Sequence, residues 1–209
     1  MIPHRFKSGL ILSSHKEKMM KKKIMALLLA CSSAFAFDVG LFTLDTEIGG
    51  NFNYTKMSLK VDDGEIFKNK DHLTYGAYGR VWLGIAGFMV APQVKWNYLK
   101  SNLEIDGGTA LDFTLQNMQY GAVLGYQIPF INLTPYVGLS YSNFIKGDIA
   151  GFKLKDTYAV NFGVNWKVPF LHLTIGFDGS YQKPKFKDQT QSVRDIEILT
   201  LGGTVGLIF

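Results

Sequence analysis

Apolar and polar residues alternate along this chain from Thr46 onward, in segments of roughly ten residues. Between Thr157 and Val168, for example, six apolar residues fall on one face and five small or polar residues fall on the other. A period of two is typical of a β-strand that has an apolar medium on one side and a polar medium on the other. The pattern therefore predicts an all-β protein in which every strand separates two media.

Eight segments carry this alternation, and the connections between them are alternately short and long. The predicted strands are 44–57, 73–84, 87–99, 112–127, 132–144, 157–168, 171–183 and 195–209. The short connections are 84–87, 128–131 and 169–170, and the longer, polar ones are 58–72, 100–111, 145–156 and 184–194. This order places all tight turns at one end and all long loops at the other, as in a closed antiparallel up-and-down barrel of about eight strands.

A repeat supports a barrel built from hairpins. Residues 126–134 recur forty residues later as residues 166–174, with a proline followed by phenylalanine at the centre of each copy. A period of forty residues also suits propeller blades, but each blade holds four strands and this period has room for two.

The inward face of the predicted barrel carries many polar and charged residues. They are Glu47, Asn51, Asn53, Arg80, Gln93, Lys95, Asn117, Gln119, Asn161, Lys167 and Asp178. In the core of a soluble protein of this size, each such group left unpaired would cost at least ~1–3 kcal/mol. Inside a membrane barrel they can pair with one another, while the apolar face contacts lipid. No segment approaches the ~20 apolar residues of a membrane-spanning helix, so a membrane would have to be crossed by strands.

The charged members of this set have two interpretations. They are Glu47, Arg80, Lys95, Lys167 and Asp178. In a narrow barrel, opposite charges on neighbouring strands would fill and rigidify the interior. Alternatively, the same groups would line a conduit for small solutes. We favour a polar, largely plugged lumen, because eight strands leave little free bore.

Aromatic residues fall in two rows at opposite ends of the predicted strands. The loop-end row is Tyr54, Tyr75, Tyr98, Tyr141, Tyr158 and Tyr181. The turn-end row is Phe88, Tyr126, Phe130, Trp166, Phe170 and Phe209. Two aromatic rows on either side of an aliphatic band predict the girdles that lie at the two lipid–water boundaries of a membrane barrel.

The N-terminal part has the features of a secretory signal. A basic stretch at 20–23 precedes a short apolar core at 24–30, and Ala34 and Ala36 supply the small residues of a cleavage site that would make Phe37 the first mature residue. The expected organisation is an upstream start-site extension at 1–19, a signal peptide at 20–36 and one barrel domain at 37–209.

Cys31 lies in this leader and is the single cysteine of the chain, so a mature protein that begins at Phe37 forms no disulfide. Residues 28–31 also resemble a lipobox, although leucine at its middle position is a poor match. Cleavage between Ala36 and Phe37 is the favoured interpretation, and lipidation of Cys31 is the alternative.

Export of the barrel domain changes the meaning of the net charge of +5. The first 36 residues carry seven basic residues and one acidic residue, whereas the remainder carries 15 basic and 16 acidic residues. The excess of positive charge belongs to the leader, and the composition gives no support to nucleic-acid binding.

The last strand ends at Phe209, with Leu207 and Val205 on the same face. This ending resembles the closing strand of bacterial outer-membrane proteins, and the resemblance implies recognition by the barrel assembly machinery. Together with the alternation and the leader, the chain resembles the small eight-stranded barrel families typified by OmpX, OmpW and the membrane domain of OmpA. The resemblance covers residues 37–209, and implies a monomeric protein of the Gram-negative outer membrane in contact with lipid and lipopolysaccharide.

The sequence predicts no catalytic, cofactor or metal site. Some eight-stranded barrels modify lipids with a histidine and an acidic partner, but His172 and Asp178 are separated by about 20 Å of one extended strand. No group of histidine, cysteine and carboxylate residues has the spacing of metal ligands. The expected role is presentation of surface-exposed loops in adhesion, envelope integrity or host contact. The alternatives are a narrow or laterally open channel for small or hydrophobic molecules and, third, a lipid-modifying enzyme.

Overall fold

The computed structural model of the protein describes residues 37–39, 42–61, 64–68, 72–105, 109–149, 152–186 and 193–209. All of them belong to one compact unit, Ala36–Phe209. The predicted start-site extension at 1–19, the predicted signal peptide at 20–36 and Cys31 lie outside the described residues. No helix in the described part of the chain is long and apolar enough to cross a membrane.

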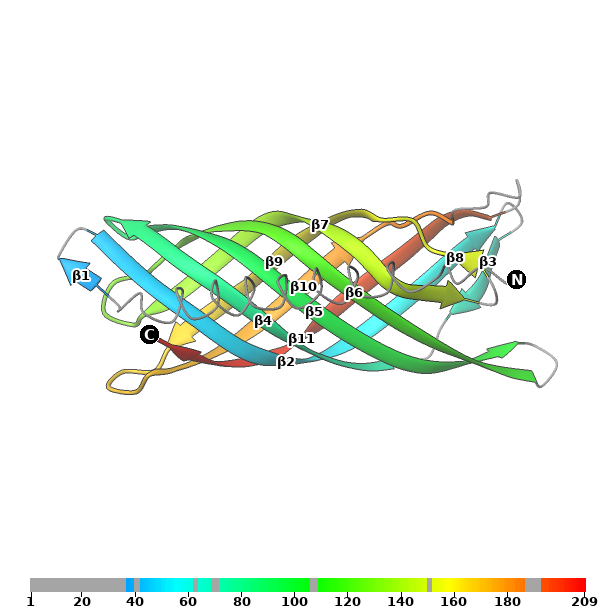
Figure 1. Cartoon of the computed structure of the whole chain (residues 1–209), viewed down its shortest axis with the longest axis horizontal. Coiled ribbons are helices and arrows are strands. Elements are labelled where there is room, and N and C mark those ends of the chain that lie inside the picture. The colour runs from blue at the N-terminus through cyan, green and yellow to red at the C-terminus, as the bar shows by residue number, and fades with distance from the viewer. Residues whose placement is uncertain are drawn as a thin grey trace, which may run out of the picture. The chain divides into compact units, whose positions relative to one another are not determined.

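The described residues form a closed antiparallel β-barrel of eight long strands (Figure 1). The long strands are β2 (Phe42–Val61), β4 (His72–Ile85), β5 (Phe88–Ile105), β6 (Thr109–Tyr126), β7 (Leu133–Ile149), β9 (Thr157–Lys167), β10 (Leu173–Gln182) and β11 (Val193–Ile208). Three short strands pair with their ends, namely β1 (Phe37–Val39), β3 (Gly64–Lys68) and β8 (Phe152–Lys153). The predicted fold class, an up-and-down barrel of about eight strands, is confirmed.

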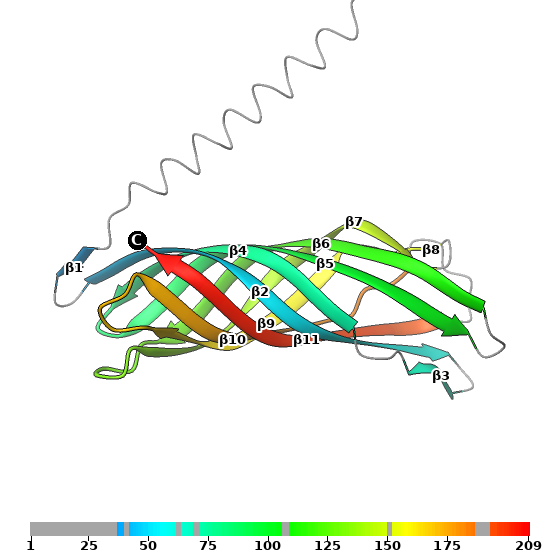
Figure 2. The same ribbon diagram turned by 90° about the horizontal axis from the view of Figure 1, so that it is seen from below.

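The barrel closes where the first long strand meets the last. β2 pairs with β4 along one edge and with β11 along the other, and Figure 2 shows β11 lying beside β2. At the end of this seam, the amide of Thr46 donates to the carbonyl of Phe209 at 2.9 Å, and the amide of Phe209 donates to the carbonyl of Thr46 at 2.8 Å. Because every long strand has a neighbour on both sides, the wall can lie in hydrocarbon without unpaired backbone groups.

The two faces of the wall have the composition that the alternation predicted. Val205 and Ile175 point outward and are 57% and 43% exposed, whereas Arg80 and Lys95 point inward and are each 2% exposed. A soluble barrel would show the opposite arrangement, with its apolar side chains in the centre. The outer surface is therefore built for contact with lipid acyl chains.

Tight turns connect the strands at one end of the barrel. They lie at Ala86 and Gly87, at residues 127–132 and at residues 168–172. Phe130 and Phe170, which occupy equivalent positions in the forty-residue repeat, both have positive φ angles, of 71° and 65°. Because a positive φ is unfavourable for a bulky residue, the shared conformation shows that the two turns are built in the same way.

At the opposite end, the wall continues further than the alternation indicated. Segments 58–72, 100–111 and 145–156 were predicted to be loops, but β2 reaches Val61, β5 reaches Ile105 and β7 reaches Ile149. At ~3.3 Å per residue and a tilt of ~40°, a strand of 20 residues such as β2 spans about 50 Å, roughly twice the ~25 Å apolar band. The loop prediction was wrong here because residues alternate only where the two faces of a strand meet different media. Strand ends that emerge into water have water on their outer face, so the alternation fades although the strand continues.

Two neighbouring glycines of β2 allow a test of this packing. A Cβ atom on Gly49, on the inward face, would lie 2.7 Å from Cζ of Tyr78, whereas a Cβ atom on Gly50 would meet nothing closer than the carbonyl oxygen of Gly76 at 3.6 Å. Replacing Gly49 with valine should therefore destabilise the folded barrel by about 1–3 kcal/mol. The matched Gly50→Val change should stay within about 0.5 kcal/mol. Urea unfolding of the protein refolded into vesicles measures both, and equal stabilities would contradict the packing.

Candidate functional site

The centre of the lumen is held by one carboxylate that bridges two cations. Asp178 on β10 accepts from Arg80 Nη2 on β4 and from Lys95 Nζ on β5, each at 2.6 Å. These three side chains are at most 2% exposed. The sequence predicted the inward direction of all three, and the structure adds that β10 and the β4–β5 pair meet across the barrel interior.

Aromatic and amide groups complete the surroundings of Arg80. The guanidinium carbon lies 4.6 Å from the ring centroid of Tyr78 and 4.7 Å from that of Tyr136. Its Nε donates to Gln93 Oε1 at 3.1 Å, and its Nη2 donates to the hydroxyl oxygen of Tyr136 at 3.1 Å. The cation is thus stabilised by a carboxylate, by an amide and by two aromatic faces.

Glu47 is the second buried carboxylate, and its partners are neutral. It accepts from the hydroxyl of Tyr78 at 2.8 Å, the indole of Trp82 at 2.7 Å, the amide of Asn165 at 3.1 Å and the hydroxyl of Thr174 at 2.8 Å. The donors come from β4, β9 and β10. Glu47 therefore ties three strands to β2 through hydrogen bonds, where an ion pair was expected from its place in the charged set.

The fifth charged residue, Lys167, forms an ion pair of its own with Asp45 near the turn end of the barrel. Sequence reasoning did not select Asp45, although it shares the inward parity of Glu47. The five predicted lumen charges are thus all inside the wall. They gather around three carboxylates, Asp178, Glu47 and Asp45, and Tyr78 links the first two groups by contacting both Arg80 and Glu47.

Amides and hydroxyls link further strands across the interior. Asn51 Nδ2 donates to Asn97 Oδ1 at 3.2 Å, Asn97 Nδ2 donates to Asn117 Oδ1 at 3.2 Å, and Asn117 Nδ2 donates to Ser142 Oγ at 2.9 Å. This chain runs over β2, β5, β6 and β7. It gives each of these four buried side chains at least one partner, while Asn51 Oδ1 has none among the described residues.

Each end of the interior contains an apolar cluster, which sequence reasoning missed. The loop-end cluster consists of Met57, Leu99, Leu115, Leu154, Ile196 and Ile198, with Phe144 and Phe186 packed against it. The turn-end cluster consists of Trp82, Met89, Ala91, Val123 and Tyr136. The alternation of the sequence could have revealed these clusters, because Leu99 and Met89 fall on the same inward face of β5 as Lys95. The polar groups around Asp178 and Glu47 therefore lie between two apolar clusters, while the Lys167–Asp45 pair lies at the turn end.

Two cavities accompany these clusters. A cavity of about 10 Å³ lies between the polar middle and the loop-end cluster, lined by residues such as Thr55, Asn97, Leu115 and Thr200. It has room for about one water molecule. At the turn end, a pocket of about 680 Å³ is lined mainly by apolar side chains of β2, β4, β5 and β6, including Phe42, Leu83, Phe88 and Leu124. This pocket lies toward the outer face of the wall, where lipid is expected.

The structure places the predicted girdle residues on the outer surface. Tyr158 is 72% exposed and Phe88 is 72% exposed, while Tyr98 and Tyr181 are half-buried. Several form ring contacts across neighbouring strands, with ring centroids 5.1 Å apart for Tyr75 and Tyr98, which are tilted. The edge-to-face pairs are Tyr141 and Tyr158 at 5.8 Å and Phe88 and Tyr126 at 5.2 Å. The other predicted members with at least 40% exposure are Tyr54, Tyr75, Tyr126, Tyr141, Phe130, Trp166, Phe170 and Phe209.

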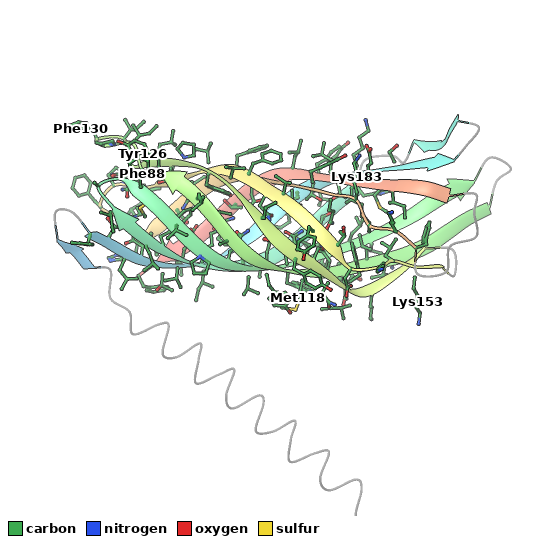
Figure 3. The ribbon with its side chains drawn as sticks, turned by 90° about the horizontal axis from the view of Figure 1, so that it is seen from above. Phe88, Met118, Tyr126, Phe130, Lys153 and Lys183 are labelled. Carbon is green, nitrogen blue, oxygen red and sulfur yellow. The ribbon has the colours of Figure 1, made fainter. Side chains whose placement is uncertain are left out.

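Figure 3 shows Phe88, Tyr126 and Phe130 together at the turn end, and Lys153 and Lys183 pointing outward near the other end. Lys183 Nζ lies 2.9 Å from Glu197 Oε1. Hydrogen bonds to Glu197 and then to Tyr181 raise the pKa of Lys183, which keeps this side chain positively charged at neutral pH. Lys183 is thus an outward cation at the loop end that is paired with a carboxylate.

The residues predicted for assembly and for signal cleavage lie at the two ends of the barrel domain. Phe209, Leu207 and Val205 share the outward face of the closing strand and are 41%, 54% and 57% exposed. Ala36 lies outside the described residues, and Phe37 begins β1, which pairs with the start of β2. Recognition of the last residues by the assembly machinery and cleavage before Phe37 remain predictions.

The described residues show no arrangement for histidine or metal chemistry. His172 is exposed in the turn at 168–172, whereas Asp178 is engaged by Arg80 and Lys95 inside the barrel. Among the described residues, no group of three or more histidine, cysteine or acidic residues is positioned to hold a metal ion.

Residues 24–209 match the family model described as the outer membrane protein beta-barrel domain, and the chain belongs to this family. It is accordingly an integral β-barrel protein of the bacterial outer membrane with a polar, buried interior. A search of curated proteins gave no match.

Several solved barrels have a similar fold. Ail, the attachment invasion locus protein of Yersinia pestis, is 15% identical with a TM-score of 0.49, covering 79% of this chain and 98% of Ail. Neisserial surface protein A is 14% identical, and its TM-score is 0.47. The match covers 78% of this chain and 96% of Neisserial surface protein A. The outer membrane protein AlkL is 16% identical, and its TM-score is 0.45. The match covers 83% of this chain and 94% of AlkL.

Removing the carboxylate of Asp178 tests the central cluster. An Asp178→Asn change leaves Arg80 and Lys95 buried together without a counter-charge, and should destabilise the barrel by about 3–5 kcal/mol. The control is Glu197→Gln, which removes the half-exposed partner of Lys183 and should cost less than about 1 kcal/mol. Both are measured by chemical unfolding in vesicles. Equal losses for the two variants would show that the central cluster does not hold the barrel together.

Proposed function

We propose that this protein is a sealed outer-membrane anchor that presents its long loop-end strands and loops at the cell surface, in adhesion, envelope integrity or host contact. The observation that carries the proposal is the filled interior. The ion-paired middle around Asp178 is followed toward the loops by the apolar loop-end cluster. A solute would have to break buried ion pairs and then cross an apolar layer.

The length of the strands supports a role on the outer side. The hairpin of β5 and β6 is paired continuously from Phe88 and Tyr126 to Ile105 and Thr109. Its last paired residues lie far beyond the aromatic row that contains Tyr98, on backbone that is held by hydrogen bonds. Such a projection can offer a binding surface at a lower entropic cost than a long free loop.

We propose further that the protein works as a monomer, without catalysis or a cofactor, and that it depends on the barrel assembly machinery for insertion. The exposed His172 and the fully engaged Asp178 argue against the histidine–acid pair of a lipid-modifying barrel.

A second candidate is a narrow channel for hydrophobic molecules. The observations that favour it are the apolar loop-end cluster inside the wall and the apolar pocket near Phe42 and Leu124. A hydrophobic solute would meet apolar side chains at both places, although the charged middle separates them.

Conductance and uptake distinguish the two candidates. The purified protein in planar bilayers should give no conductance steps under conditions in which a general porin gives them. A Leu115→Trp change, which overfills the loop-end cluster, should leave uptake of a hydrophobic solute by whole cells unchanged. Reproducible steps, or a several-fold loss of uptake in the Leu115→Trp cells, would instead establish a channel.

Shortening the β5–β6 hairpin tests surface presentation directly. Residues 101–113 are replaced by Asn-Gly, a two-residue turn that can close the pair Lys100 and Thr114. The barrel should still fold, as shown by a change in its gel mobility after heating. Attachment of the cells to host cells or matrix should fall several-fold. Leu115→Trp serves as the lumen control and should attach normally. Attachment that survives the shortening and fails in the lumen control would contradict the proposal.

A further inference from the structure

The small cavity between the polar middle and the loop-end cluster lies where side chains from most of the wall meet. It measures about 10 Å³, and residues of β2, β4, β5, β6, β10 and β11 line it. Its polar lining residues are Thr55, Thr74, Asn97, Asn117, Gln182 and Thr200, each at most 8% exposed. A small molecule in this cavity would therefore lie against six of the eight long strands at once.

One acceptor in this lining is unsatisfied. Gln182 is 3% exposed, and its Oε1 has no hydrogen-bond partner among the described residues. A buried carbonyl oxygen in this state destabilises a fold, and native proteins satisfy nearly all such atoms with protein groups or with ordered water. Because Gln182 lines the cavity, a donor inside the cavity can satisfy it.

The threonines of the lining have a hydroxyl hydrogen to give. Thr55 Oγ1 lies 2.5 Å from Thr74 Oγ1 and 3.2 Å from Thr200 Oγ1. Each hydroxyl carries one hydrogen, so the group has three hydrogens and these two contacts use two of them. One hydroxyl of this group can therefore donate into the cavity.

Thr200 is the member of the group that is placed closest to Gln182 in the register of the wall. Gln182 on β10 pairs with Ile198 on β11, and Thr200 follows Ile198 by two positions on the same inward face. Gln182 and Thr200 are thus diagonal neighbours, whose Cα atoms are typically about 7–8 Å apart. At that separation, one molecule that both donates and accepts can link the two side chains.

We propose that the cavity binds one structural water molecule, which donates to Gln182 Oε1 and accepts from the hydroxyl of Thr200. The amide groups of Asn97 and Asn117 are further partners, because each nitrogen carries two hydrogens and uses one of them in the amide chain. A site of about this volume with two to four polar partners is what a buried water requires. The water would complete the last polar layer before the loop-end cluster.

The lining favours water over the other occupants of this size. It contains no carboxylate, so a cation would lose its hydration without gaining a counter-charge. Leu99, Leu115 and Ile198 face the same space and offer a cation no ligand. An apolar occupant would leave Gln182 Oε1 unpaired. The site is the same in a sealed anchor and in a narrow channel, so it goes beyond the proposed function and does not depend on it.

The wild-type protein alone provides the first test. A high-resolution crystal structure of the full barrel should show one water at hydrogen-bond distance from both Gln182 Oε1 and Thr200 Oγ1. A structure with these side chains in place and no density between them would overturn the proposal. Urea unfolding should give the same midpoint in sodium chloride and in choline chloride of equal ionic strength. A barrel that is more stable in sodium would show that the occupant is a cation.

A double-mutant cycle tests the bridge energetically. Gln182→Met removes the acceptor and keeps a side chain of similar length, and Thr200→Val removes the hydroxyl and keeps the shape. Thr200→Val should raise the equilibrium constant of unfolding in vesicles, and in the Gln182→Met background this rise should be about threefold smaller or less, because the bridge is already lost.

The matched control is Thr204→Val on the same strand. Thr204 is likewise buried and inward-facing, but it does not line the cavity. Its replacement should raise the unfolding constant by the same factor in both backgrounds. An equal effect of Thr200→Val in the two backgrounds would contradict a shared water. If a variant fails to fold, the wild-type crystal structure still decides, and neither outcome alters the conductance and attachment results.

Discussion

A strand can lie in hydrocarbon only when all of its backbone N–H and C=O groups are paired within the wall. In this protein that condition is met by the seam between β2 and β11, which runs from Glu47 and Ile208 to Val61 and Val193 and is extended by the exchange between Thr46 and Phe209. Once the seam is closed, the direction of every side chain follows. Apolar residues such as Val205 face lipid, and residues such as Arg80 are enclosed with whatever partners the interior supplies.

The enclosed charges show how a narrow barrel can be both polar and stable. Asp178 is shared by Arg80 and Lys95, while Glu47 is satisfied by four neutral donors and Asp45 pairs with Lys167. Each cation therefore has a carboxylate, and the interior carries no large excess of either charge. The apolar clusters above and below keep the groups around Asp178 and Glu47 away from bulk water, whereas Lys167 is 22% exposed. This shielding strengthens the hydrogen bonds of the enclosed groups and makes any unpaired member costly. In the sealed anchor that we propose, the same arrangement also closes the lumen.

The outward surface is organised by the surrounding media in the same way. Aliphatic residues form the middle band, tyrosines form the boundary on the loop side, and lysines follow the tyrosines by two positions on three strands. At the turn end the outermost groups are instead phenylalanines such as Phe130 and Phe170, which are fully exposed. The two ends of the barrel therefore present different kinds of outward side chain beyond their aromatic rows.

Alternation by itself determined the strand class, the inward or outward direction of residues such as Lys95 and Ile175, and the position of the tight turns. It could do so because side chains of a strand point alternately to its two faces. Neighbouring residues therefore differ in polarity when one face meets lipid and the other meets the lumen. It failed beyond Lys100 and around Ile149, where the strands leave the membrane and the contrast of media disappears. The tertiary structure alone decided which lumen groups meet. Asp178 lies 98 residues from Arg80 and 83 from Lys95 along the chain, and Glu47 lies 127 from Thr174. Such contacts depend on the register and tilt of all eight strands around the closed wall, a quantity that no local pattern of residues contains.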